Sequence, residues 1–226
     1  TVLLSAVSRM QHEGGSGREV VEVWRGVILK SAKVIYPLSI FCCLFASPIV
    51  ERIYGPEYRE AAIFLQLVTP VTLLRVVPYS PVLLALGRGR LFSRIHLGAA
   101  VVLILAEAVC VRCFPSAVAL ALINTLCTAG ALGALLCAVR SAVRVGWRQL
   151  LPAGSLAGVL ALSAVASGAS RLAVGSVCGW SGLAAAFSLA ALLYAGLCAV
   201  CGISYRELWQ PLLALLPRRR GDNGKK

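Results

Sequence analysis

Two charged side chains lie well inside apolar stretches of the chain, away from their ends, where they are the groups best placed to do chemistry. Arg75 lies near the middle of one stretch, and Glu107 lies in the second half of the next. A guanidinium in the middle of a bilayer costs roughly 2.5–3.5 kcal/mol unless it faces a cavity or a partner. Arg is always charged and its planar fork can hold two phosphate oxygens, so we expect Arg75 to line a polar cavity and bind an anionic substrate. The alternatives are an internal ion pair with Glu107 and a span whose boundary lies elsewhere.

Glu107 is the one acid inside the apolar stretches. Its carboxylate allows three interpretations: a proton or cation site, the counter-ion of Arg75, or a side chain that reaches the nearer interface. The two stretches follow each other and would run antiparallel, so contact between the two side chains is feasible. Arg112, near the end of the same stretch, is expected to anchor that end at an interface.

The stretch around Arg75 is also interrupted by Pro70, Pro78 and Pro81. Proline removes a backbone hydrogen bond and kinks a helix, and the released carbonyl groups need polar partners. Broken helices line substrate paths in transporters. We therefore predict that Gln66 and Tyr79 bind substrate along the same path as Arg75. The alternative is the ordinary tolerance of proline in membrane helices.

The composition indicates which elements must position these residues. Of the 226 residues, 59% are hydrophobic and 14% are charged, whereas an ordinary soluble domain has about 25% charged residues. The apolar stretches are continuous and about 20 residues long, which fits helices and not barrel strands. We predict an all-α fold, a polytopic bundle of about six membrane-spanning helices with an N-terminal amphipathic segment. This excludes a soluble globular domain, a disordered chain and a nucleic-acid-binding protein.

Six stretches are long enough to cross a hydrocarbon core about 30 Å thick. They are Val34–Val50 with a start as early as Val27, Ala61–Leu86, Ile95–Phe114, Ala117–Val139, Leu150–Ser170 and Val177–Ile203. Thr125 and its neighbour Asn124 in the fourth are expected to hydrogen-bond between helices, and the alternative is that they line a cavity. Gly154-Ser-Leu-Ala-Gly158 in the fifth is a GxxxG pattern, which predicts close packing against the sixth.

The basic residues alternate along the chain. Of the 22 Lys and Arg residues, 17 lie in four segments: before the first stretch, after the second stretch, after the fourth stretch and in the tail. Another 4 lie in the other loops, and Arg75 lies inside the second stretch. The positive-inside rule places the loops that are rich in Lys and Arg in the cytoplasm. We therefore predict a multi-pass membrane protein with both ends cytoplasmic.

Four regions follow from this pattern. Residues 1–33 hold the end of a preceding span, a Gly-rich linker and the amphipathic segment. Residues 34–140 hold four spans, 141–203 hold two spans rich in small residues, and 204–226 form a basic cytoplasmic tail. The amphipathic segment is either a helix on the membrane surface, with basic side chains at anionic headgroups, or the lead-in to the first span.

Few residues point to catalysis or metal binding. The 9 cysteines are odd in number, and neither Cys110-Val-Arg-Cys113 nor Cys198-Ala-Val-Cys201 has partner ligands nearby. His12 and His96 are isolated residues near the predicted cytoplasmic face. An enzyme would need paired carboxylates or a His/Asp group in an external loop, and these short loops offer three Glu residues. We predict no metal, no cofactor and no enzymatic activity.

Four stretches carry motifs of a known transporter family. They are the span end Thr1–Arg9, the proline segment Tyr36-Pro37-Leu38, the external turn Ile53–Ala62 and the Gly-Arg turn Leu83–Arg90. Glycines in the last two would end helices with positive φ. Together these stretches resemble the C-terminal half of Wzx-type oligosaccharide flippases, in the multidrug/oligosaccharidyl-lipid/polysaccharide exporter superfamily.

The resemblance implies a transporter that flips a lipid-linked oligosaccharide across the inner membrane for cell-surface polysaccharide synthesis. Its partners would be membrane lipids and a polyprenyl-pyrophosphate-linked glycan, whose pyrophosphate Arg75 would bind. We also expect the chain to be the C-terminal part of a longer protein, with a missing N-terminal half. The alternatives are a drug or cation antiporter of the same superfamily and a membrane scaffold that transports nothing.

Overall fold

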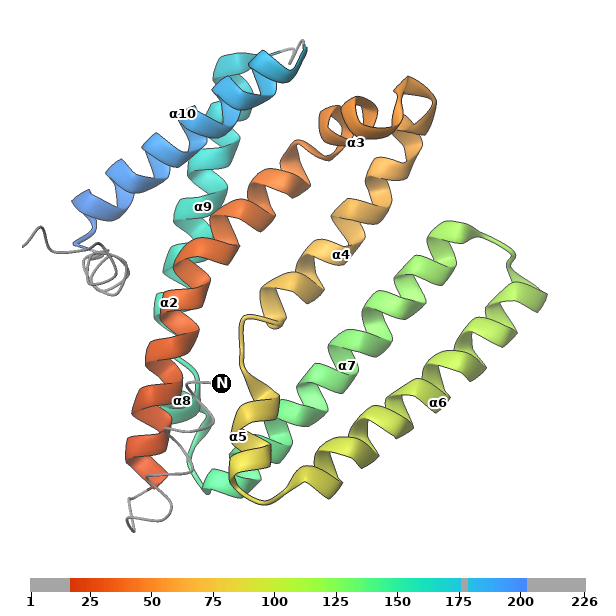
Figure 1. Cartoon of the computed structure of the whole chain (residues 1–226), viewed down its shortest axis with the longest axis vertical. Coiled ribbons are helices and arrows are strands. Elements are labelled where there is room, and N and C mark those ends of the chain that lie inside the picture. The colour runs from red at the N-terminus through yellow and green to blue at the C-terminus, as the bar shows by residue number, and fades with distance from the viewer. Residues whose placement is uncertain (1–16, 176–178, 203–226) are drawn as a thin grey trace, which may run out of the picture.

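The computed structural model describes residues 17–175 and 179–202, and this part of the chain is built from helices (Figure 1). Within it, six segments are long and apolar enough to cross a membrane. They are Glu19–Leu44, Pro56–Ala85, Gly89–Cys113, Ala117–Val143, Ala153–Val174 and Gly179–Val200. This confirms the predicted all-α bundle of about six spans. The predicted span end at 1–9, most of the Gly-rich linker and the basic tail lie outside the described residues.

Successive spans run in opposite directions (Figure 1). The elements are α2 (Gly17–Leu44), α3 (Ala46–Tyr54), the 3-10 helix η1 (Pro56–Ala61), α4 (Ala62–Leu74), α5 (Tyr79–Ala85), α6 (Gly89–Cys113), α7 (Ala117–Val143), α8 (Trp147–Leu150), α9 (Ala153–Val174) and α10 (Gly179–Val200). The start of α2, the α5–α6 turn and the α7–α8 turn lie together at one end, here termed the basic end. The loops rich in Lys and Arg therefore lie at the basic end and the loops poor in them at the other end, as the predicted topology requires.

Two sets of helices meet along α2. On one side α9 packs against α2 and α10, and on the other α4 packs against α2 and α7, while α6 packs against α7. The largest buried cluster includes Trp24 and Ile28 of α2, Leu83 of α5 and Leu135 of α7. Thr125 of α7 donates to a carbonyl oxygen of α4 at 3.3 Å, which confirms its predicted hydrogen bond between helices.

The segment 18–33 continues without a break into the first span. Both belong to α2, which has 28 residues and is therefore about 42 Å long. Its apolar side recurs every four residues, and Trp24, Ile28 and Ala32 are buried, whereas Glu19 and Lys30 are exposed. The amphipathic pattern is thus present, but its apolar side faces other helices. Of the two interpretations, the structure supports the lead-in to the first span.

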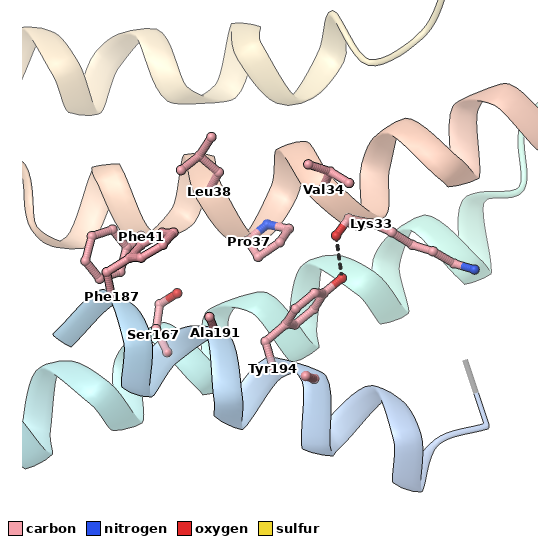
Figure 2. A pocket seen from close by; sticks show the side chains of 11 residues that line it. Lys33, Val34, Pro37, Leu38, Phe41, Ser167, Phe187, Ala191 and Tyr194 are labelled. Carbon is pink, nitrogen blue, oxygen red and sulfur yellow. Dashed lines mark hydrogen bonds between the residues drawn. The ribbon is translucent and has the colours of Figure 1, made fainter. Parts of the chain in front are cut away.

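Pro37 lies inside α2 and cannot donate a hydrogen bond to the carbonyl oxygen of Lys33, four residues earlier. The hydroxyl of Tyr194 in α10 donates to that oxygen at 3.1 Å (Figure 2). Tyr194 is itself buried. A neighbouring helix therefore supplies a donor where proline removes one, and this bond ties α10 to α2.

The contact between α9 and α10 depends on serine and alanine, and the predicted role of the Gly154–Gly158 motif was wrong. Both glycines are exposed, and a methyl group added to either would meet nothing within 4 Å. The contact lies further along α9, where the buried Ser170 hydroxyl donates to the carbonyl oxygen of Ala186 at 2.7 Å. The spacing of small residues does not show which side of a helix faces its neighbour.

The end of α7 has an unusual backbone conformation. Arg144 has φ 58° and ψ 42°, and its N–H donates to the carbonyl oxygen of Arg140 at 2.9 Å. Among the described residues it is the one with positive φ that is not glycine. Glycine is usual at this position, since the left-handed conformation costs an L residue roughly 1–2 kcal/mol. The chain thus keeps an arginine side chain where glycine would relieve the backbone.

Candidate functional site

Arg75 lies where the second span is interrupted. The helix α4 ends at Leu74, α5 begins at Tyr79, and residues 75–78 between them are not helical. Arg75 is therefore at a break and not in the middle of a continuous helix. Non-helical backbone at membrane depth is tolerated only where protein groups or water satisfy its polar atoms.

Side chains on two elements satisfy this break. The indole N–H of Trp24 in α2 donates to the carbonyl oxygen of Pro78 at 3.3 Å. The hydroxyl of Tyr79 donates back to the carbonyl oxygen of Leu74 at 3.1 Å. Both aromatic side chains are buried. The break is thus stabilised by specific hydrogen bonds to Leu74 and Pro78, which lie on either side of Arg75 in the chain.

Arg75 lines a cavity of about 290 Å³ between α4, α6 and α7. One face of α6 and the middle of α7 form its other walls, through His96, Ala99, Ala100, Leu103, Cys127, Thr128, Ala131, Leu132 and Leu135. The small alanine side chains leave the space open. The polar side chains are those of Arg75, His96 and Thr128, with the thiol of Cys127 beside them.

His96 is the residue that sequence reasoning missed. It is isolated in the sequence, and the structure brings it to the same cavity as Arg75. Its Nδ1 lies 3.1 Å from the carbonyl oxygen of Phe92, one turn earlier in α6. A proton on Nδ1 would let it donate to this oxygen and leave Nε2 to accept a hydrogen bond. The helical spacing of His96, Ala99 and Leu103 marks one face of α6, but no pattern in the sequence shows that Arg75 lies beside that face.

The ion pair between Arg75 and Glu107 is not formed within the described structure. Glu107 is half-buried in α6, eleven residues beyond His96. Eleven residues are about three helical turns, so Glu107 lies on the same side of α6 and roughly 16 Å further along its axis. It does not line the cavity. Arg75 therefore faces this cavity without a carboxylate from Glu107.

Gln66 and Tyr79 lie outside the cavity. The amide nitrogen of Gln66 donates to the carbonyl oxygen of Cys43 in α2 at 3.4 Å. Gln66 precedes Arg75 by nine residues, or two and a half turns, and would face the other side of a regular helix. The Tyr79 hydroxyl is already bonded to Leu74 across the break. In the structure Gln66 joins α4 to α2 and Tyr79 closes the break, so the three predicted substrate-binding residues do not converge on one site.

A larger cavity of about 480 Å³ lies between α2, α9 and α10 (Figure 2). Its walls include Pro37, Phe41 and Phe187, with Lys33 and Tyr194 near one end. Most of this lining is apolar, which suits a hydrocarbon group better than a charged substrate. We therefore assign the candidate site for a polar substrate to the Arg75 cavity.

The Arg75 cavity is suited to noncovalent binding of an anion. Arg75 offers a permanent positive charge with several N–H donors, Thr128 offers a hydroxyl, and His96 offers an imidazole. In residues 17–175 and 179–202, no group of three His, Cys, Asp or Glu side chains is placed to hold a metal ion.

Comparisons of the chain with protein-family models, curated proteins and solved structures find no match. The turns that carry the flippase resemblance do have the predicted backbone, with φ 110° at Gly55 and φ 70° at Gly87. Such turns are compatible with many helical membrane proteins. Sequence and structure together establish a polytopic α-helical membrane protein with six candidate spans.

Proposed function

We propose that this chain is part of a transporter, and not an enzyme, that flips a lipid-linked oligosaccharide across the inner membrane for cell-surface polysaccharide synthesis. The observation that carries the proposal is the position of Arg75, at the break of a membrane helix and in the wall of a cavity with His96 and Thr128. Interrupted helices form substrate sites in many transporters.

In this proposal Arg75 binds the pyrophosphate of a polyprenyl-pyrophosphate-linked glycan. A guanidinium can hold two phosphate oxygens at once and keeps its charge in a medium of low dielectric constant. Thr128 and His96 then hydrogen-bond to the remaining oxygens. Gln66 and Tyr79 act as positioning residues, because their hydrogen bonds hold α4 and the break in place.

The proposed orientation has both ends in the cytoplasm, so that the basic end of the bundle meets the inner leaflet. The asymmetry of Lys and Arg between alternate loops supports it. His96 is seven residues from the start of α6 at Gly89, which in this orientation puts it in the cytoplasmic half of the membrane. A substrate assembled in the cytoplasm would reach that half first.

A drug or cation antiporter of the same superfamily is the second candidate, and Glu107 is the observation that favours it. A half-buried carboxylate within a candidate span could bind a proton or a cation. A scaffold that transports nothing is the third candidate. A scaffold has no need of a charged side chain in a cavity, so loss of transport on neutralising either Arg75 or Glu107 separates it from both transporters.

The test introduces variants at the native gene and measures glycan export together with the abundance of the protein in the membrane. Arg75→Ala should abolish export at normal abundance, and Arg75→Lys should restore part of it, since lysine keeps the charge but loses the bidentate fork. Arg112→Ala is the matched control: Arg112 is exposed at the far end of α6 and lies outside the cavity.

The double variant Arg75→Ala with Glu107→Ala decides between substrate binding and charge neutralisation. If Arg75 only neutralises Glu107, removing both charges should recover export, and this result would contradict the substrate-binding role. Loss of drug or cation transport in Glu107→Ala, with that transport kept in Arg75→Ala, would favour the antiporter.

A further inference from the structure

A second basic cavity lies at the corner where α7 turns into α8, at the basic end of the bundle. Its volume is about 430 Å³, and it is lined by Cys137, Arg140, Ser141, Arg144, Val145 and Gly146. It shares no lining residue with the Arg75 cavity. The corner is therefore a separate site.

The guanidinium of Arg140 is held in place by its surroundings. Its central carbon lies 4.6 Å from the centroid of the Trp147 ring, a distance at which a cation is attracted to the face of an indole. The short helix α8, which carries Trp147, is tied to α2, since Arg25 donates to the carbonyl oxygen of Gln149 at 3.2 Å. A guanidinium that is already oriented loses less freedom when it binds a ligand.

Arg144 adds a second positive charge, and carboxylates are absent from this part of the chain. The sequence has no Asp or Glu between Glu107 and Glu207. Neither Arg140 nor Arg144 forms an ion pair with any residue of the described structure. Arg144 has the left-handed conformation in which glycine is usual, so a side chain is kept there against a backbone preference. Both charges are available to an anion from outside the protein.

We propose that the α7–α8 corner binds the phosphate headgroup of an anionic phospholipid. Arginines beside the end of a membrane span are the residues that attract anionic headgroups, and two guanidinium groups can share one phosphate. A lipid suits the site better than a soluble anion for two reasons. Trp147 is of the residue type that lies at headgroup level, and Cys137 continues the cavity one turn deeper along the span.

The test titrates the purified full chain in neutral detergent with fluorescent phosphatidylglycerol, and with phosphatidylcholine as reference. Wild type should bind phosphatidylglycerol more tightly. Arg140→Gln and Arg144→Gly should each weaken that binding about fivefold, which corresponds to about 1 kcal/mol per basic residue near an anionic surface. Arg148→Gln is the control, because Arg148 lies in the same basic segment but outside the cavity; its effect should be below about twofold.

Arg144→Gly shows whether binding is lost because a charge is removed or because the fold is disturbed. Glycine accepts positive φ without strain, so this variant should melt in phosphatidylcholine at or above the wild-type temperature while it loses the preference for phosphatidylglycerol. An equal loss in Arg148→Gln would indicate a diffuse charge effect and overturn the proposal. It would also be overturned if wild type does not prefer phosphatidylglycerol, or if millimolar glycerol phosphate competes as well as the lipid does.

Discussion

Replacing Tyr194 by Phe tests whether the bond between α10 and α2 compensates for Pro37. The substitution removes one hydroxyl from a buried ring and with it the bond to the Lys33 carbonyl oxygen at 3.1 Å. A buried acceptor that loses its donor costs roughly 1–3 kcal/mol in soluble proteins. Measured hydrogen bonds between membrane helices average about 0.6 kcal/mol and reach about 1.7 kcal/mol.

We expect a value near the upper end of the membrane range. A carbonyl oxygen inside a membrane helix normally accepts a hydrogen bond from the N–H four residues later. Pro37 has no N–H to donate to the Lys33 oxygen in this way. Tyr194→Phe should therefore lower the free energy of unfolding by about 1.4 kcal/mol, or about tenfold in the unfolding constant.

The deciding measurement is a double-mutant cycle with Pro37→Ala, which restores an N–H donor four residues after Lys33. In that background Tyr194→Phe should cost about 0.5 kcal/mol or less, since the Lys33 oxygen keeps a bond within α2. The assay is reversible unfolding in mixed micelles of increasing denaturing-detergent content, followed by tryptophan fluorescence.

Tyr79→Phe provides the control for this cycle. Its hydroxyl also donates to a carbonyl oxygen at 3.1 Å, but to Leu74 across the break in the second span. Its cost should be the same in the wild-type background and in the Pro37→Ala background. An equal cost of Tyr194→Phe in both backgrounds would refute the idea that this hydroxyl replaces the donor that proline removes.

Two further predictions concern α9 and the topology. Ser170→Ala should lower the free energy of unfolding by about 1 kcal/mol, because the Ser170 hydroxyl bonds across helices to Ala186. Ser163→Ala should change it little, because the Ser163 hydroxyl bonds only within α9. Equal losses in the same micelle assay would argue against the interhelical role of Ser170. Reporter domains inserted after Glu57 and after Arg144 should give signals from opposite sides of the membrane, external and cytoplasmic, and signals from one side would refute the predicted topology.

The number of the spans was predictable because it depends on local chemistry. Continuous apolar stretches show the length of each span, and the alternation of basic loops predicts which loops lie at the same end of the bundle. The start of the first span was less well predicted, since Trp24 and Ile28 are apolar whether they face lipid or protein. Only packing shows that they are buried against other helices.

The candidate site was predicted in part. Three prolines indicated an interruption near Arg75, but not that the helix would end beside it. His96 was missed, and Gln66, expected on the same path as Arg75, does not line the cavity, because cavity membership depends on how α4, α6 and α7 are rotated about their axes. That rotation is set by contacts between segments that are distant in sequence, such as the bond from Thr125 to Leu67.

The hydrogen bond from Trp24 to Pro78 also sets a condition on the order of assembly. The donor and the acceptor are 54 residues apart, and the acceptor lies in the non-helical segment 75–78 of the second span. While the chain is being made, α2 enters the membrane before the second span does. The indole is therefore already present when the interrupted segment leaves the translocon, and a variant with these two spans in reverse order would expose that segment to lipid first.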